Sequence, residues 1–234
     1  MQEKLIQLMC VSTNFEENYM CNCGCDDDVM AEFIYDLNKL FSSVDEVQNL
    51  APYIKELNLK VFTDENYKSA SFDDKIRNAI EDVFNNNIES KKIKFDYDLI
   101  LKYIEYCSSL INYLDNVSEE QFVELASKNP KVLYLVNSFS LDTLKAIIKN
   151  NYKTALVIDT DCMNDESLYD TYLYKNRDNF LGDKELYDLY IDGLKKVLQE
   201  DKMKYIYMAL DAGYDAAEYE YGKLLREKDP DEAM

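Results

Sequence analysis

Apolar residues that recur at every third or fourth position run through most of this chain, and this spacing constrains the fold more than any other feature. The longest stripe comprises Leu99, Ile100, Tyr103, Ile104, Cys107, Leu110, Ile111 and Leu114, which would share one face of a helix. Helix start signals accompany other stripes: Ser118 and Gln121 have the spacing of a capping box, and Ser140 precedes an apolar pattern at 141–152. The chain is therefore expected to consist of amphipathic helices.

Three short stretches compete for a strand assignment. Apolar residues alternate at 57–61 and at 93–97, and the run at 154–158 is apolar throughout. The whole chain of 234 residues has only 5 Gly and 3 Pro, which leaves little turn chemistry for a large sheet. We predict a mostly α fold, a helical bundle or helix-hairpin array, with at most a small accessory β element.

Two polar stretches, at 63–71 and 159–166, interrupt the apolar pattern and are candidate joints between regions. They divide the chain into three regions. These are an N-terminal helical region with a Cys-rich loop (1–62), a central helical region (63–158) and a C-terminal helix-hairpin region (159–234).

The charge balance restricts the class of partner. Asp and Glu number 46 against 26 Lys and Arg, which gives a formal net charge of −20. Such a surface repels nucleic-acid phosphate, so direct DNA or RNA binding is not expected. A basic protein surface is the favoured partner, although the same charge also serves solubility, and both interpretations stay open.

The chain contains no histidine, which removes the usual general base and the commonest metal ligand. No glycine-rich phosphate loop is present either, so we predict that the protein is not an enzyme and has no cofactor. No apolar run approaches the roughly 20 residues that span a bilayer, and the first residues do not form a signal peptide. We therefore expect a cytoplasmic protein without membrane contact.

Three cysteines stand at alternate positions, Cys21, Cys23 and Cys25, and would point to one side of an extended segment. Cys10 could supply a fourth thiolate to a soft-metal site. The neighbouring carboxylates at 26–28 raise thiol pKa values, and the spacing differs from the paired CxxC of structural zinc sites. A reduced loop is favoured over a metal site.

The segment LVIDTDCMND places Asp159, Asp161 and Asp165 after a short apolar run. It resembles the DTDPGxDD cluster of inosine-uridine nucleoside hydrolases and the DxDxT motif of haloacid dehalogenase phosphatases. This resemblance implies a divalent-cation-dependent hydrolase that uses the three aspartates, which is the alternative to a binding protein. Cys162 and Met163 depart from both motifs, and the simpler interpretation is an acidic linker whose Asp165 caps the next helix.

From Asp201 the chain reads DKMKYIYMALDAGYDAAEYEYGKLLREKDPDEA, with small or aromatic residues at Ala209, Gly213, Ala217, Tyr219 and Gly222. This pattern resembles the Sel-like repeats, short relatives of the tetratricopeptide repeat, over about 50 C-terminal residues. The resemblance implies helix hairpins that scaffold protein partners. The helical signals of the sequence predict separate helices at about 184–199 and 202–212. The glycine-rich turn that is usual in the repeat family is missing at 197–202.

The densest acidic stretch is 158–192, which contains ten carboxylates and only three cations. The candidate partner-binding residues lie at its end: Asp183, Glu185, Asp188, Asp192, Tyr187 and Tyr190. Exposed tyrosines would serve as interface anchors, whereas buried ones would be core. We predict an acidic interaction module for a basic partner. A sharper hypothesis is an inhibitor that imitates nucleic acid on a nucleic-acid-processing enzyme, of phage or bacterial origin.

Overall fold

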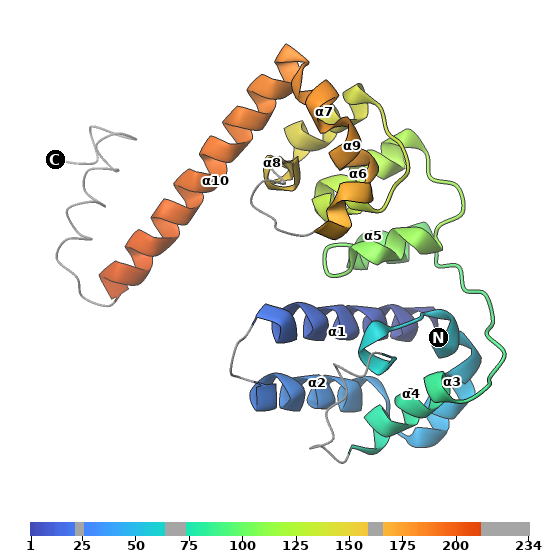
Figure 1. The fold of residues 1–234 in the computed structure, drawn as a ribbon. Helices are drawn as coiled ribbons and strands as arrows, with labels where there is room; N and C mark the ends of the chain where they lie inside the picture. Colours follow the sequence, from blue (N-terminus) through green and yellow to red (C-terminus); the bar gives the residue numbers. More distant parts are fainter. Residues whose placement is uncertain (22–25, 64–73, 159–165, 212–234) are drawn as a thin grey trace. The chain divides into compact units, whose positions relative to one another are not determined.

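The computed structural model describes residues 1–21, 26–63, 74–158 and 166–211 (Figure 1). These residues form helices and no strand, which confirms the mostly α fold class. The accessory β element is not found among them. Residues 57–61 lead from one helix into a 3-10 turn, 93–96 have no regular structure, and 154–158 form a short helix.

The chain folds as two compact units, Met1–Leu135 and Val136–Met234, here called the N-terminal and C-terminal units. The predicted joints at 63–71 and 159–166 lie mostly outside the described residues. The division into three regions stays a prediction.

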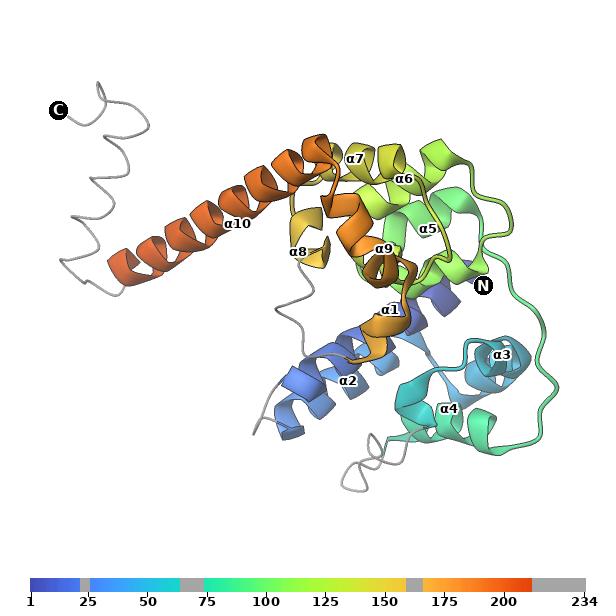
Figure 2. The same cartoon turned by 45° about the horizontal axis from the view of Figure 1, so that its top comes forward.

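The N-terminal unit begins with two helix pairs. Helix α1 (Gln2–Cys21) packs along α2 (Asp26–Leu40), and α3 (Val44–Glu56) packs along α4 (Lys75–Asn85), as both views show (Figures 1 and 2). The polar start of α3 is secured by Ser43, whose hydroxyl accepts a hydrogen bond from the Glu46 amide. The start of α4 is secured by Asp74, whose side chain accepts a hydrogen bond from the Arg77 amide.

Aromatic rings tie these helix pairs together. Phe15 of α1 stacks on Phe33 of α2, with ring centroids 4.3 Å apart. Phe33 in turn lies 5.8 Å from Phe62 in the 3-10 turn η1 (Lys60–Phe62), and Phe62 lies 6.0 Å from Phe84 of α4. Such contacts between large rings add to the free energy of burial, so this row forms the centre of the core.

The second half of the N-terminal unit contains the long apolar stripe at 99–114, and here the helix prediction is wrong. Instead of one helix, α5 (Tyr97–Tyr103) is followed by a separate 3-10 helix, η3 (Ser108–Tyr113). The carbonyl of Ile104 accepts a 2.8 Å hydrogen bond from the Asn129 side chain, which replaces the bond that a longer helix would have made. Most of the stripe is buried even so: Ile100, Ile104, Cys107, Leu110 and Ile111 lie in the core, whereas Leu99, Tyr103 and Leu114 are half-buried.

Two further elements complete this unit. Helix α6 (Glu119–Lys128) starts with the predicted capping box of Ser118 and Gln121, which the structure confirms. The 3-10 helix η4 (Pro130–Tyr134) follows and packs on α6 and η3. Leu125, Val132 and Leu133 are fully buried there.

The C-terminal unit consists of α7 (Leu141–Asn150), α8 (Thr154–Ile158), the 3-10 helix η6 (Glu166–Asp170), α9 (Tyr172–Leu181) and α10 (Lys184–Asp211). Ser140 caps α7 as predicted, with its hydroxyl accepting from the Thr143 amide at 3.0 Å. Helix α10 packs on α7, α8 and α9. Leu144, Ile147 and Leu186 are fully buried between these helices.

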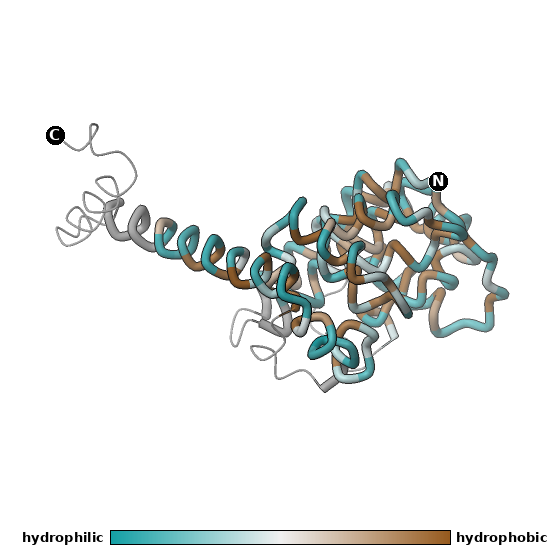
Figure 3. The backbone as a smooth tube through the Cα atoms, turned by 90° about the horizontal axis from the view of Figure 1, so that it is seen from above, coloured by the Kyte–Doolittle hydropathy of each residue, from teal (hydrophilic) through white to brown (hydrophobic). Residues whose placement is uncertain are grey.

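Helix α10 is continuous, so the two separate helices expected at 184–199 and 202–212 are a wrong prediction. The stretch 197–202, VLQEDK, contains neither Gly nor Pro, and nothing in it ends a helix. The hydropathy of α10 alternates along its length between hydrophilic and hydrophobic positions (Figure 3). None of the described helices combines the length and the apolar character that a bilayer crossing requires.

Candidate functional site

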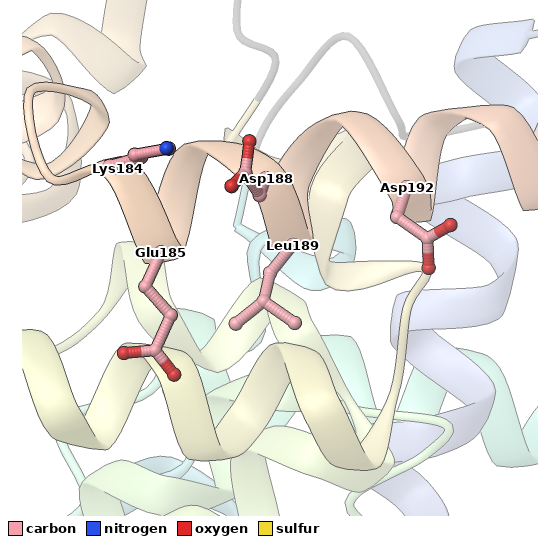
Figure 4. A pocket seen from close by; sticks show the side chains of 5 residues that line it. All are labelled: Lys184, Glu185, Asp188, Leu189 and Asp192. Carbon is pink, nitrogen blue, oxygen red and sulfur yellow. The ribbon is translucent and has the colours of Figure 1, made fainter.

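A hollow with three carboxylates in its lining runs along the first turns of α10 and is here called the acidic groove (Figure 4). It has a volume of about 560 Å³ and is lined by Lys184, Glu185, Asp188, Leu189 and Asp192. These residues recur at three- and four-residue intervals, which places them along one side of the helix. Three of the four predicted partner-binding carboxylates therefore line one groove.

The opposite side of α10 holds the helix in place. Leu186, Tyr190, Gly193 and Val197 are buried, at intervals of four, three and four residues. Gly193 allows a close approach, because a Cβ there would lie 2.8 Å from the Tyr152 carbonyl oxygen and 2.9 Å from the Ala155 Cβ. This tight packing against the start of α8 sets the rotation of α10, and so decides which carboxylates face outward.

Asp183, the fourth predicted carboxylate, has a structural role at the start of α10. Its Oδ1 accepts a 3.0 Å hydrogen bond from the Leu186 amide, and it lies 3.0 Å from Lys145 Nζ of α7. The backbone bond, followed by the Lys145 ammonium, lowers the pKa of Asp183 below its usual range. Asp183 is thus the N-terminal capping residue of the helix and is not free to meet a partner.

Glu185 lies in the groove but is paired within the unit. Its two oxygens meet Lys149 at 2.8 Å and Lys145 at 3.0 Å, and Lys149, then Lys145, lower the pKa of Glu185. Lys145 is only 12% exposed, and the carboxylates of Asp183 and Glu185 raise its pKa. These ion pairs attach α10 to α7 and neutralise part of the negative charge.

The two remaining groove carboxylates differ. Asp192 pairs with Lys196 one turn further along α10, at 2.7 Å. Asp188 is exposed and makes no hydrogen bond or ion pair within the described part of the chain. Leu189 also lines the groove and points to the same side of the helix as Glu185, whereas Asp188 points to the other side in this view (Figure 4). A cation with an apolar stem could place the stem on Leu189 and the charge near Asp188.

The two tyrosines proposed as anchors lie in different environments. Tyr187 is 46% exposed, as an interface anchor requires. Tyr190 is only 7% exposed, so the structure corrects its assignment: it is part of the core that holds α10, because it shares the helix side of Leu186 and Gly193. The rings of the two residues are 6.3 Å apart.

The cysteine cluster is only partly described. Cys21 is the last residue of α1, so this position is helical and not part of an extended segment, while Cys23 and Cys25 lie outside the described residues. Cys10 lies within α1, where burial, and secondarily its closeness to Cys107, raises the pKa of its thiol to about 12. Within 1–21, 26–63, 74–158 and 166–211, no three Cys, Asp or Glu side chains come together in a way that could hold a metal.

The aspartates of the hydrolase alternative, Asp159, Asp161 and Asp165, also lie outside the described residues. The apolar run before them forms the helix α8, not the strand that precedes the motif in both hydrolase families. The hydrolase hypothesis stays untested.

A second hollow, of about 460 Å³, was not foreseen from the sequence. It lies in the N-terminal unit between α1, residues 57–60 and η3. The Cys107 sulfur lies 3.4 Å from Thr13 Oγ1 and 3.1 Å from Ser109 Oγ, and the Tyr113 hydroxyl donates to the Leu57 carbonyl. These groups satisfy one another, so the hollow is an internal polar cluster that assigns no ligand. Its residues come from three separate segments, and no sequence pattern connects them.

Comparison of the chain with models of known protein families, with characterised proteins and with solved structures found no match. The Sel-like resemblance therefore stays an expectation, since Gly213, Ala217, Tyr219 and Gly222 lie outside the described residues. Leu189 and Lys184 were missed as groove residues. Their spacing of four from Glu185 and Asp188 was the signal that could have identified them.

Proposed function

We propose that this protein is an interaction module whose acidic groove on α10 binds a basic side chain of a protein partner. The main support is the placement of Asp188, an exposed carboxylate without an internal partner among the described residues, in the groove of about 560 Å³ that Leu189 also lines. Lysine and arginine have an apolar stem and a charged head, so both parts of either side chain have a matching surface there. The net charge of −20 adds a long-range attraction for basic proteins.

The sharper form of the proposal is that the partner is a nucleic-acid-binding protein and that the chain competes with nucleic acid. It is supported by charge alone. If it is right, duplex DNA added to a purified complex should displace the chain from its partner. A complex that binds DNA without releasing the chain would argue against nucleic-acid imitation and leave the groove proposal intact.

The groove proposal is tested by affinity capture from the native source with matched variants. Asp188→Lys/Asp192→Lys changes the groove, and Asp82→Lys/Asp178→Lys makes the same change of net charge at exposed sites in the last turns of α4 and α9. Partners retained by the wild type and the control pair but lost from the groove pair bind through α10. Because exposed charges act mainly on the rate of encounter, association should also slow in the groove variant.

Equal loss of partners from both variant pairs would show that only net charge matters, and the groove would then have no specific role. Circular dichroism of both variants must match that of the wild type. Calorimetric titration with Ca²⁺ or Mg²⁺ separates the hydrolase alternative, which requires tight cation binding, from the interaction module, for which no binding heat is expected.

A further inference from the structure

A second surface of α10, which shares only Asp188 with the acidic groove, is apolar and partly uncovered. Tyr187, Ile191, Leu194 and Leu198 follow one another at intervals of four, three and four residues, here called the apolar stripe. At 3.6 residues per turn, the stripe lies next to the buried side of α10 and away from Glu185 and Leu189. Its ends are open, with Tyr187 46% and Leu198 68% exposed, while Ile191 and Leu194 are half-buried.

This is the spacing of the contact positions in a two-stranded coiled coil, where residues alternately three and four positions apart are buried between the two helices. On its other edge the stripe is bordered by Asp188 and Lys195, both exposed. Neither side chain makes an ion pair or hydrogen bond within the described residues, whereas their neighbours Asp192 and Lys196 pair with each other. On this edge of the stripe, Asp188 is thus an anion and Lys195 a cation that have no partner among the described residues.

Asp188 and Lys195 cannot pair with each other in one chain. They are seven residues apart, or about 10 Å along the helix axis at 1.5 Å per residue. In a second copy running in the opposite direction, however, the order of the two charges is reversed. Asp188 of one copy then lies opposite Lys195 of the other, and the two-fold axis repeats the pair.

The apolar positions agree with the same arrangement. When the two stripes are aligned antiparallel about their midpoint, Tyr187 lies opposite Leu198 of the second copy and Ile191 opposite Leu194. In a parallel arrangement Asp188 and Lys195 would instead lie opposite the edge of the stripe that contains Tyr190 and Val197, and neither of these residues carries a charge. The order of the charges therefore selects the antiparallel direction.

We propose that the apolar stripe of α10 is a self-association surface, which takes the stripe of a second copy in an antiparallel two-fold contact closed by two Asp188–Lys195 ion pairs. This proposal does not depend on the binding of a basic partner, since self-association is measured with the purified chain alone. Lys195, unlike Asp188, does not line the groove, so Lys195→Asp separates loss of the dimer from loss of the partner.

The test is sedimentation equilibrium of the full chain over a range of protein concentrations. The wild type should form a dimer in a reversible equilibrium. Asp188→Lys places two lysines opposite each other, and Lys195→Asp places two aspartates opposite each other, so each change should weaken the dimer by about tenfold. The double variant Asp188→Lys/Lys195→Asp restores opposite charges in the antiparallel contact and should recover most of the wild-type affinity. Asp178→Lys, an exposed reversal on α9, is the control and should leave the dimer unchanged.

A wild type that stays monomeric at every concentration overturns the proposal. So does a dimer whose dissociation constant is unchanged by both single charge reversals. Failure of the double variant to recover affinity would exclude the antiparallel pairing. Leu198→Glu gives a second measurement: it should abolish the dimer with no loss of thermal stability in the monomer. If the wild type is monomeric and Leu198→Glu has a lower melting temperature than the wild type, the stripe is covered by the chain's own residues and the proposal is wrong. If Leu198→Glu does not fold, the charge variants, which lie at exposed positions, decide.

Discussion

In the C-terminal unit, the roles of single residues depend both on local hydrogen bonding and on packing against distant segments. Asp183 looks like part of an acidic patch in the sequence, yet it caps α10 and contacts Lys145 of α7. Gly193 looks like a weak point in a helix, yet the Tyr152 carbonyl and the Ala155 side chain leave no room for a Cβ. The ion pair of Asp183 and the close packing of Gly193 each involve a segment about 40 residues away in the chain.

Gly193→Ala is the residue-scale prediction. In an exposed helix, alanine would stabilise by about 1 kcal/mol relative to glycine, but here the added Cβ meets backbone and side-chain atoms. We expect the free energy of unfolding to fall by about 1–3 kcal/mol in urea titration followed by circular dichroism. Gln199→Ala, an exposed change on the same helix, should stay within about 0.5 kcal/mol. A Gly193→Ala protein as stable as the wild type would mean that α10 is not packed as closely as described.

Between elements, α7 and α10 are joined by buried apolar residues and by ion pairs at the edge of their contact. Lys145 and Lys149 of α7 pair with Glu185, and Lys153, just beyond α7, lies 3.6 Å from Glu200 of α10. The Tyr152 hydroxyl, then Lys153, lower the pKa of Glu200. These ion pairs make the stability of the contact between α10 and α7 depend on pH.

The pH dependence has a defined sign. Glu185 has its pKa lowered in the folded protein from an ordinary value of 4.5, so its pair stabilises the fold above that value and is lost as pH falls through the lowered pKa. Lys149→Gln removes one partner of Glu185. The wild type should therefore be more stable than Lys149→Gln at about pH 7, and this difference should vanish once Glu185 is protonated.

Denaturant titration at a series of pH values measures this difference. Lys175→Gln, which removes a pair between two exposed side chains in the same unit, is the control. A stability difference that persists in acid would show that the Lys149 side chain acts through packing and not through its charge.

At the scale of the whole molecule, two compact units have separate cores. Phe15, Phe33 and Phe62 lie in the core of the N-terminal unit, and Leu144, Ile147 and Leu186 lie in the core of the C-terminal unit. Each unit spans about the length of a small domain that folds cooperatively by itself. The stability of one should therefore respond little to changes in the other.

Differential scanning calorimetry tests this independence. We expect two transitions. Leu37→Ala, in the core of the N-terminal unit, should lower one melting temperature, and Leu186→Ala, under α10, should lower the other, each by roughly 10 °C or more. If either change shifts both transitions equally, the units unfold as one.

The sequence by itself predicted several features that depend on near neighbours, although the continuity of α10 through 197–202, which is also local, was not predicted. Reasoning from the sequence predicted the helix starts at Ser118 and Ser140 and the apolar faces of the helices. It also singled out the carboxylates along 183–192, three of which line the groove. Caps, periodicity and local charge all involve residues within one or two turns of each other. Only the tertiary structure decided that the helix after Tyr97 stops where Asn129 takes over the Ile104 carbonyl. It likewise decided that Tyr190 is buried while Tyr187 is exposed, and that Lys145 pairs with Asp183 and Glu185 and leaves Asp188 without a partner among the described residues. Burial and ion pairing depend on segments that are distant in the chain, and their positions are set by the packing of the complete core.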